Sequence, residues 1–120
     1  MVMKKFLRGF GYASNGIAHA AKTQLNFRVE LVTAALSICL GFALHISGNE
    51  WQWVMLNITL VLIAELFNTA IEFLTDLVSP GYNELAGRVK DVSAGAVLIT
   101  CCFALISGTI IFLPKLIVLI

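Results

Sequence analysis

The order of apolar and polar positions divides the 120-residue chain into one amphipathic segment and three long apolar ones. In residues 1–28, apolar side chains recur every three or four positions, and basic side chains lie on the opposite side. This pattern is typical of a helix that rests on a membrane surface. No continuous apolar run follows the basic start, which argues against a cleavable signal peptide. We therefore expect a surface helix over residues 1–28.

The three apolar segments are each long enough to cross a bilayer core of roughly 30 Å. They cover residues 29–48, 51–78 and 91–113 and are separated by a polar break at 47–50 and a turn-forming sequence at 79–83. We predict an all-α integral membrane protein. It is one domain over residues 1–120, with three transmembrane helices and the N-terminal amphipathic helix.

The composition excludes an ordinary soluble domain. Apolar residues make up 59% of the chain and charged residues 12%, whereas about a quarter of a soluble domain is charged. The three cysteines all fall within apolar runs, so we interpret them as apolar packing residues rather than disulfides or a metal cage. His19 and His45 have no metal-ligand spacing and are interpreted as structural.

The distribution of basic residues predicts the orientation. Five Lys or Arg residues precede the first acidic residue, Glu30, and none occurs in the loop at 47–52. Arg88 and Lys90 stand before the third span, and Lys115 is a single exception after it. Because basic residues concentrate on the cytoplasmic side, the N-terminus and the second loop should be cytoplasmic.

The second span contains a stripe of polar side chains: Glu65, Asn68, Glu72 and Asp76. At about 100° per residue the three carboxylates lie within roughly 20° of one another, with Asn68 about 60° aside. Glu65 lies about 21 Å along the helix from Trp51, near the cytoplasmic headgroup level. Ionisable groups at this depth are costly and are functional candidates by default.

The stripe and the start of the third span together suggest phosphoryl transfer. Carboxylates hold Mg²⁺, Lys90 beside Asp91 can neutralise the phosphates of ATP, and one carboxylate can accept the proton of a hydroxyl at headgroup depth. No Walker-type or protein-kinase motif is present. Two alternatives stay open: ion pairs that only lock helices together, and a small cation or proton conduit along the stripe.

Two segments resemble the signature of a known family. They are Glu65-Leu-Phe-Asn68-Thr-Ala-Ile-Glu72 and, after Asp76, the run from Tyr82 to Val97. Both are similar to the small prokaryotic lipid kinases, the diacylglycerol kinase and undecaprenol kinase family. The resemblance implies a homotrimeric bundle in the bacterial inner membrane, with active sites between subunits on the cytoplasmic side. It also implies ATP, Mg²⁺ and a membrane lipid as partners, and no nucleic acid.

The resemblance also implies roles for individual residues. Glu65 matches the catalytic base, Asn68 a residue that helps to hold the site, and Glu72 a Mg²⁺ ligand. Further positions match contacts with the nucleotide: Lys90 near the phosphates, Asp91 near the base, and Tyr12, Tyr82 and Asn83 along it. The family often has His where this chain has Asn83.

Gln24 departs from the family, which has Glu at this position as the second carboxylate on the metal. An amide offers one neutral oxygen, so the affinity for Mg²⁺ should fall. The departure has three possible meanings: a weakened or inactive member that acts as a membrane scaffold, a metal site compensated by Glu30, or a variant with weaker metal demand. On a continuous helix Glu30 is roughly 240° away, so compensation requires a helix break.

The lipid acceptor is left open by the sequence. The segment from Gly108 to Lys115 and the turn before Pro80 resemble the undecaprenol branch more than the diacylglycerol branch.

Overall fold

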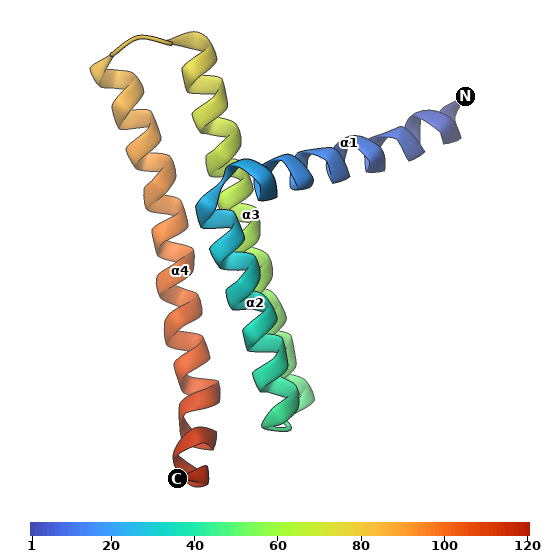
Figure 1. Cartoon of the computed structure of the whole chain (residues 1–120), viewed down its shortest axis with the longest axis vertical. Coiled ribbons are helices and arrows are strands. Elements are labelled where there is room, and N and C mark those ends of the chain that lie inside the picture. Colours follow the sequence, from blue (N-terminus) through green and yellow to red (C-terminus); the bar gives the residue numbers. More distant parts are fainter.

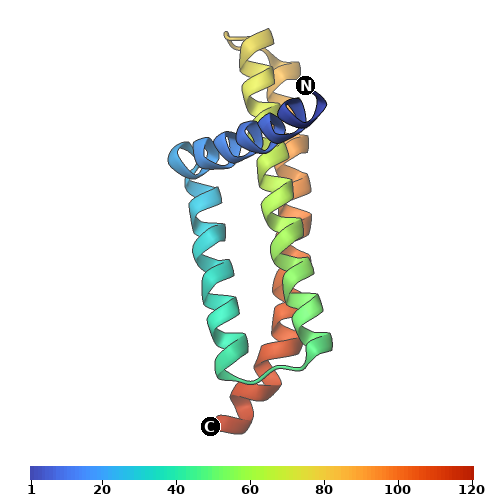
Figure 2. The same ribbon diagram turned by 90° about the vertical axis from the view of Figure 1, so that its right-hand side faces the viewer.

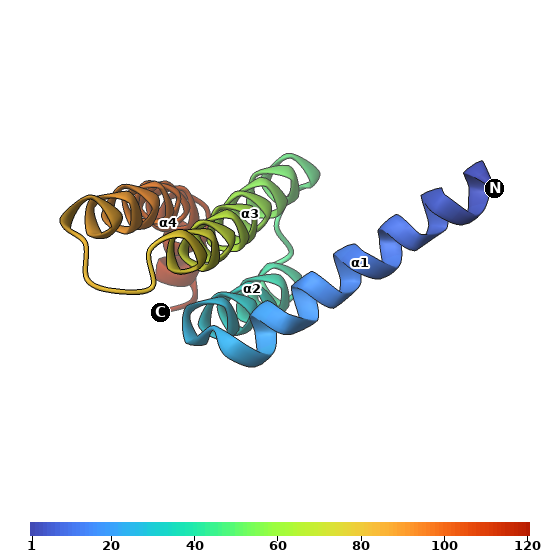
Figure 3. The ribbon, with the colours of Figure 1, turned by 90° about the horizontal axis from the view of Figure 1, so that it is seen from above.

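The computed structural model describes residues 1–120 and consists entirely of helices and short connections. The helices are α1 (Val2–Thr23), α2 (Leu25–Ala43), α3 (Gly48–Val78) and α4 (Glu84–Leu119). Helices α2, α3 and α4 run side by side, and α1 projects away from one side of this bundle (Figures 1 and 3). The last three are long and apolar enough to cross a membrane. The predicted all-α membrane fold with an additional N-terminal helix is thus confirmed.

Helices α3 and α4 are longer than a membrane span requires. They contain 31 and 36 residues, whereas about 20 residues cross the hydrocarbon core. Their lengths are roughly 46 and 54 Å at 1.5 Å per residue, so both extend beyond that layer. At the end joined by residues 79–83, they continue past the corner between α1 and α2 (Figure 1).

The boundary between the surface helix and the first span lies earlier than the sequence predicts. The expected helix over residues 1–28 stops at Thr23, because Gln24 has an extended backbone with φ −109° and ψ 111°. Arg28 Nη1 donates hydrogen bonds to the carbonyl oxygens of Ala21 at 3.0 Å and Lys22 at 2.9 Å. These bonds satisfy carbonyls left free where α1 ends. Arg28 therefore belongs to α2 and caps the preceding helix.

The opposite end of the bundle is closed by a tight turn between α2 and α3. Ser47 Oγ accepts a hydrogen bond from the Glu50 N–H at 3.1 Å, and Glu50 Oε1 accepts one from the Ser47 N–H at 2.9 Å. This reciprocal pair is a capping box, which fixes the start of α3. Trp51 packs over Gly41, where a Cβ would lie only 2.6 Å from Cη2 of the indole. The predicted polar break is thus a helix start.

Helix α4 begins before and ends after its expected bounds of 91–113. Asn83 Oδ1 accepts a hydrogen bond from the Ala86 N–H at 3.1 Å, which starts the helix near Glu84. Pro114 lies inside the helix, which continues to Leu119. The C-terminal part of α4 turns aside from the rest of the helix (Figure 2), as expected where a proline removes a hydrogen bond. Lys115 then forms an ion pair with Glu50 at 3.1 Å. This pair accounts for the one basic residue beyond the third span.

Candidate functional site

The polar stripe predicted from the sequence lies in the half of α3 that approaches residues 79–83. Glu65 is only 2% exposed, and Asn68 and Thr69 are also buried. Glu72 is half-buried and Asp76 is exposed. The stripe therefore leads from the protein interior at Glu65 to the surface at Asp76, and its inner members face protein rather than lipid.

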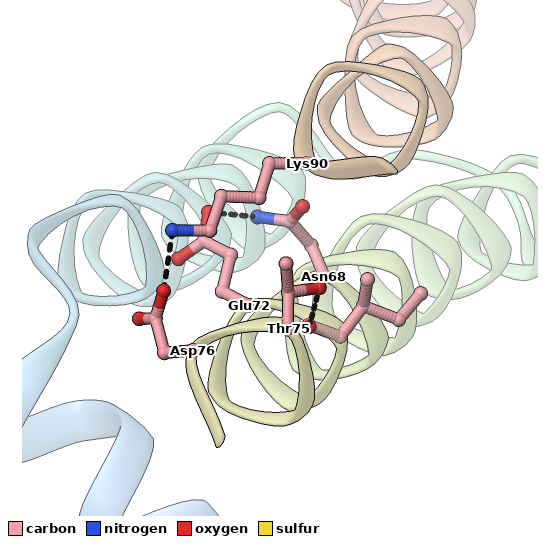
Figure 4. Close-up of polar contacts among 6 residues, drawn as sticks. Asn68, Glu72, Thr75, Asp76 and Lys90 are labelled. Atoms are coloured by element: carbon pink, nitrogen blue, oxygen red, sulfur yellow. Dashed lines mark hydrogen bonds and ion pairs between the residues drawn. The ribbon is translucent and has the colours of Figure 1, made fainter. Parts of the chain in front are cut away.

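Two polar contacts organise the outer part of this stripe. Asn68 Nδ2 donates a hydrogen bond to Glu72 Oε1 at 3.2 Å. Lys90 Nζ donates to Asp76 Oδ1 at 2.6 Å, which joins α4 to α3. Figure 4 shows the Lys90 side chain reaching from α4 toward Asp76, with Glu72 and Asn68 beside it.

The ion pair between Lys90 and Asp76 is accessible to water. The two side chains are 39% and 60% exposed, and exposed ion pairs of this kind contribute little to stability. Lys90 also lies within electrostatic reach of Glu72. An anionic ligand can therefore compete with Asp76 for the ammonium group.

The inner part of the stripe contains buried oxygens without hydrogen-bond partners. They are Glu65 Oε2, Asn68 Oδ1, Thr69 Oγ1 and, from α2, Glu30 Oε2. Buried polar atoms are almost always paired in proteins. This group of unpaired oxygens therefore marks the position as one with a task beyond packing. From the sequence, Glu30 is expected only as a possible metal ligand, and Thr69 has no expected role.

A metal ion would find few protein ligands in one chain. No group of three or more His, Cys, Asp or Glu side chains is placed to hold one. Gln24 lies at the break between α1 and α2, and its amide nitrogen donates to Thr23 Oγ1 at 3.2 Å. Its carbonyl oxygen is thus free, as is one oxygen of Glu72. Each is an oxygen of the kind that Mg²⁺ binds, and this ion commonly takes one or two protein oxygens and completes its shell with water and phosphate. No contact within one chain joins Gln24 to Glu72.

The remaining site residues predicted from the sequence are dispersed in a single chain. Tyr12 on α1 is 71% exposed, and Tyr82 in the turn is 98% exposed. Asn83 uses its side-chain oxygen to cap α4, and Asp91 is exposed on the first turns of that helix. No hydrogen bond or ion pair joins any of them to Glu72. The chain alone brings together Asn68, Glu72, Asp76 and Lys90, with Glu65 deeper in the stripe.

Comparison with known proteins gives a consistent result. The family model for prokaryotic diacylglycerol kinase matches residues 11–112. The undecaprenol kinase of Bacillus subtilis (strain 168) is 37% identical over 114 residues, which is 95% of this chain and 93% of the relative. The diacylglycerol kinase of Synechocystis sp. is 40% identical over 116 residues, 96% of this chain and 66% of the relative.

A third relative is less similar and matches a slightly shorter part of the chain. The diacylglycerol kinase of Escherichia coli (strain K12) is 31% identical over 107 residues, covering 89% of this chain and 88% of the relative. The matched residues 11–112 include the whole polar stripe, Lys90 and Asp91. The chain therefore belongs to the prokaryotic diacylglycerol kinase family and is a membrane-embedded lipid kinase.

Proposed function

We propose that this chain transfers the γ-phosphate of ATP, with Mg²⁺, to the hydroxyl of undecaprenol in the cytoplasmic leaflet of a bacterial inner membrane. The observation that carries the proposal is the stripe from the exposed Lys90–Asp76 pair to the buried Glu65. A phosphate donor arrives from water, whereas a lipid hydroxyl stays at headgroup depth. A site that binds both substrates needs an exposed cation for the phosphate donor and a buried carboxylate for the lipid hydroxyl.

Each end of the stripe has a chemical task. Glu65 accepts the proton of the lipid hydroxyl as a general base, and Asn68 holds the site by its contact with Glu72. Lys90 exchanges Asp76 for the phosphates, because the existing ion pair is exposed and weak. Asp91, Tyr12, Tyr82 and Asn83 contact the nucleotide. Glu72 and Gln24 hold Mg²⁺, which neutralises phosphate charge when bound.

The complete site requires more than one chain. The side chains of Tyr12, Tyr82 and Asp91 are exposed, and none of them forms a polar contact with Glu72. In addition, only 11 of the 120 residues are buried within one chain. In a homotrimer with each site formed between neighbouring subunits, a second subunit supplies the rest of the site. The exposed nucleotide residues of one copy would then face the stripe of another.

Diacylglycerol is the second candidate acceptor. It is favoured by the relative from Synechocystis sp., named a diacylglycerol kinase and 40% identical to this chain. Undecaprenol is favoured by the relative from Bacillus subtilis, which this chain covers almost completely. The stripe is compatible with either hydroxyl, so the acceptor must be measured.

A transfer assay with both lipids tests the proposal. The purified protein is placed in vesicles that contain undecaprenol or diacylglycerol at equal mole fraction, and ATP labelled in its γ-phosphate is added with Mg²⁺. We expect label in undecaprenyl phosphate at a higher rate than in phosphatidic acid. A faster rate with diacylglycerol would make diacylglycerol, and not undecaprenol, the preferred acceptor. Label in neither lipid, from a protein that remains folded and trimeric, would favour a scaffold without turnover.

The proposed orientation has its own test. In a background without native cysteines, Asn49→Cys and Glu84→Cys are exposed to an impermeant thiol reagent in sealed cells. Asn49→Cys should react and Glu84→Cys should not, because the basic residues near Gly87 keep that loop in the cytoplasm. Reaction at position 84 alone would place the polar stripe on the side without ATP.

A further inference from the structure

Helix α1 is attached to the rest of the chain near its C-terminal end. It projects away from α2, α3 and α4 (Figures 1 and 3), and Ala20 is its only buried residue. It joins α2 through Gln24, whose extended backbone interrupts the helical path. Arg28 binds the carbonyl oxygens of Ala21 and Lys22, but these bonds lie at the corner itself. Few contacts therefore determine the direction in which α1 projects.

One aromatic contact joins α1 to α3 before this corner. The ring of His19 on α1 meets the ring of Phe73 on α3 edge-on, with the ring centroids 5.7 Å apart and an angle of 64° between the ring planes. Aromatic pairs prefer this geometry. No side-chain hydrogen bond or ion pair joins α1 to α3. Phe73 directly follows Glu72, so α1 meets α3 at the level of the polar stripe.

The membrane surface alone cannot set the direction of α1. An amphipathic helix lies in the plane of the interface, which determines its depth and its tilt. The interface is the same in every direction within that plane, so the helix could still rotate about the membrane normal. Contacts with the bundle must prevent this rotation. A contact resists rotation better when it lies away from the pivot, and His19 lies about 6 Å along α1 from Thr23 at the corner.

A change in this direction would displace Tyr12, which lies further out on α1. Tyr12 is about 16 Å along the helix from Thr23, so a rotation of about 20° at the corner would move it by roughly 6 Å. A displacement of this size removes any contact between a side chain and a bound substrate. The position of Tyr12 therefore depends on what holds α1 against α3.

We infer that His19 is a positioning residue: its contact with Phe73 sets the direction of α1 in the membrane plane and thereby places Tyr12 at the nucleotide. The part that concerns Tyr12 rests on the nucleotide role proposed above for that residue. His19 acts through α1 and needs no contact with ATP or lipid. Another flat aromatic ring of similar size should therefore replace it, whereas a small aliphatic side chain should not.

Distance measurements by pulsed electron paramagnetic resonance test the direction of α1 without any turnover. Spin labels are attached to Lys5→Cys on α1 and Leu77→Cys on α3, both at exposed positions, in a background without native cysteines. Labelled chains are diluted with unlabelled ones, so that each measured pair lies within one chain. Position 5 lies about 27 Å along α1 from the corner, so a rotation of about 20° moves its label by roughly 9 Å.

The distance distribution should be narrow in the chain with His19 and in His19→Phe. In His19→Ala it should broaden or shift by several ångströms, because the contact with Phe73 is lost. Asn15→Ala, an exposed position one turn away on α1, is the matched control and should leave the distribution narrow. The same distribution in His19→Ala as in the chain with His19 would overturn the inference.

Kinetics test the consequence for the nucleotide. In His19→Ala the KM for ATP should rise about threefold or more while kcat changes less than about twofold, because Tyr12 contributes to binding and not to the chemical step. His19→Phe should restore the KM, and Asn15→Ala should not change it. A merely structural role would lower the apparent Tm of His19→Ala without this separation of KM from kcat, and that result would overturn the link to Tyr12.

The two measurements separate the inference from the proposed function. If the distance distribution broadens in His19→Ala but the protein phosphorylates neither lipid, the positioning of α1 stands and the kinase proposal fails. If lipid is phosphorylated and the distribution does not change, the kinase proposal stands and the role of His19 is wrong.

Discussion

The two ends of the α3–α4 pair use the same kinds of polar residue in different ways. At the end near the α2–α3 turn, Glu50 accepts from Ser47 and pairs with Lys115. At the other end, the oxygens of Glu65, Asn68 and Thr69 include buried atoms without partners. Polar groups that only support a fold are normally satisfied, whereas unsatisfied groups concentrate at functional sites. The first end is therefore structural and the second is the site.

Between the two ends lies Asn57, whose side chain is only partly hydrogen-bonded. Asn57 Nδ2 donates to Ser107 Oγ at 2.9 Å and links α3 to α4 in the apolar layer, while Asn57 Oδ1 is unpaired. It is an isolated amide with no carboxylate or cation beside it. A lone unpaired atom is thus weaker evidence for function than the group around Glu65.

The largest effect that would sharpen this comparison is expected at Glu65. Glu65→Gln should lower the rate of lipid phosphorylation about 10²- to 10⁴-fold, because a general base typically contributes that much. Equilibrium binding of Mg-ATP should be nearly unchanged. Glu72→Gln should instead weaken Mg-ATP binding. Equal loss of nucleotide affinity in both variants would contradict the division of roles.

The next effect concerns stability at the opposite end. Gly41→Ala places a Cβ 2.6 Å from Cη2 and 2.9 Å from Cζ2 of Trp51, and overpacking of this kind costs about 1–3 kcal/mol. The apparent Tm should fall while the activity of the folded fraction stays unchanged. Gly108→Ala is the matched control, since a Cβ there has nothing within 4 Å. An unchanged Tm for Gly41→Ala would mean that Trp51 can move aside.

A smaller effect is expected at Gln24, where the chain departs from its family. Gln24→Glu adds a charged ligand to a site with few protein oxygens, so the Mg²⁺ midpoint for lipid phosphorylation should fall several-fold and activity should rise. Trimer assembly should not change. Gln52→Glu, at the far end of α3, controls for the added charge. An unchanged midpoint would show that position 24 does not reach the metal.

The helices could be predicted from the sequence because each apolar run is long and has polar ends. Their bounds were less accurate for reasons of three-dimensional contact. Arg28 looks like part of the basic N-terminal segment, but its hydrogen bonds to Ala21 and Lys22 make it the cap of α1. Pro114 looks like a helix end, although α4 continues through it to Leu119.

In the candidate site, too, the features within one helix could be predicted and the contacts between helices could not. The periodicity of α3 alone places Glu65, Asn68 and Glu72 on one side, and the structure agrees. The pairing of Lys90 with Asp76 depends on how α3 and α4 pack, which periodicity cannot give. The roles of Tyr12, Tyr82 and Asn83 stay predictions, because they depend on surfaces beyond one chain.

Two ion pairs between α3 and α4 provide the most direct test of the central claim. Both join a carboxylate of α3 to a lysine of α4, at 3.1 Å for Glu50–Lys115 and 2.6 Å for Asp76–Lys90. The measurement is the rate of labelled phosphate transfer to lipid in two double variants, Glu50→Gln/Lys115→Gln and Asp76→Asn/Lys90→Gln, each with its apparent Tm.

The account predicts opposite outcomes for the two variants. The Glu50/Lys115 variant should keep its rate per folded molecule and lose a little stability, seen as a small fall in its apparent Tm. The Asp76/Lys90 variant should keep its Tm within a few degrees and lose at least about tenfold in transfer rate, because the phosphates no longer meet a cation. Equal transfer rates in the two variants, or the reverse order, would contradict the assignment of the kinase site to the half of the bundle that contains Glu65.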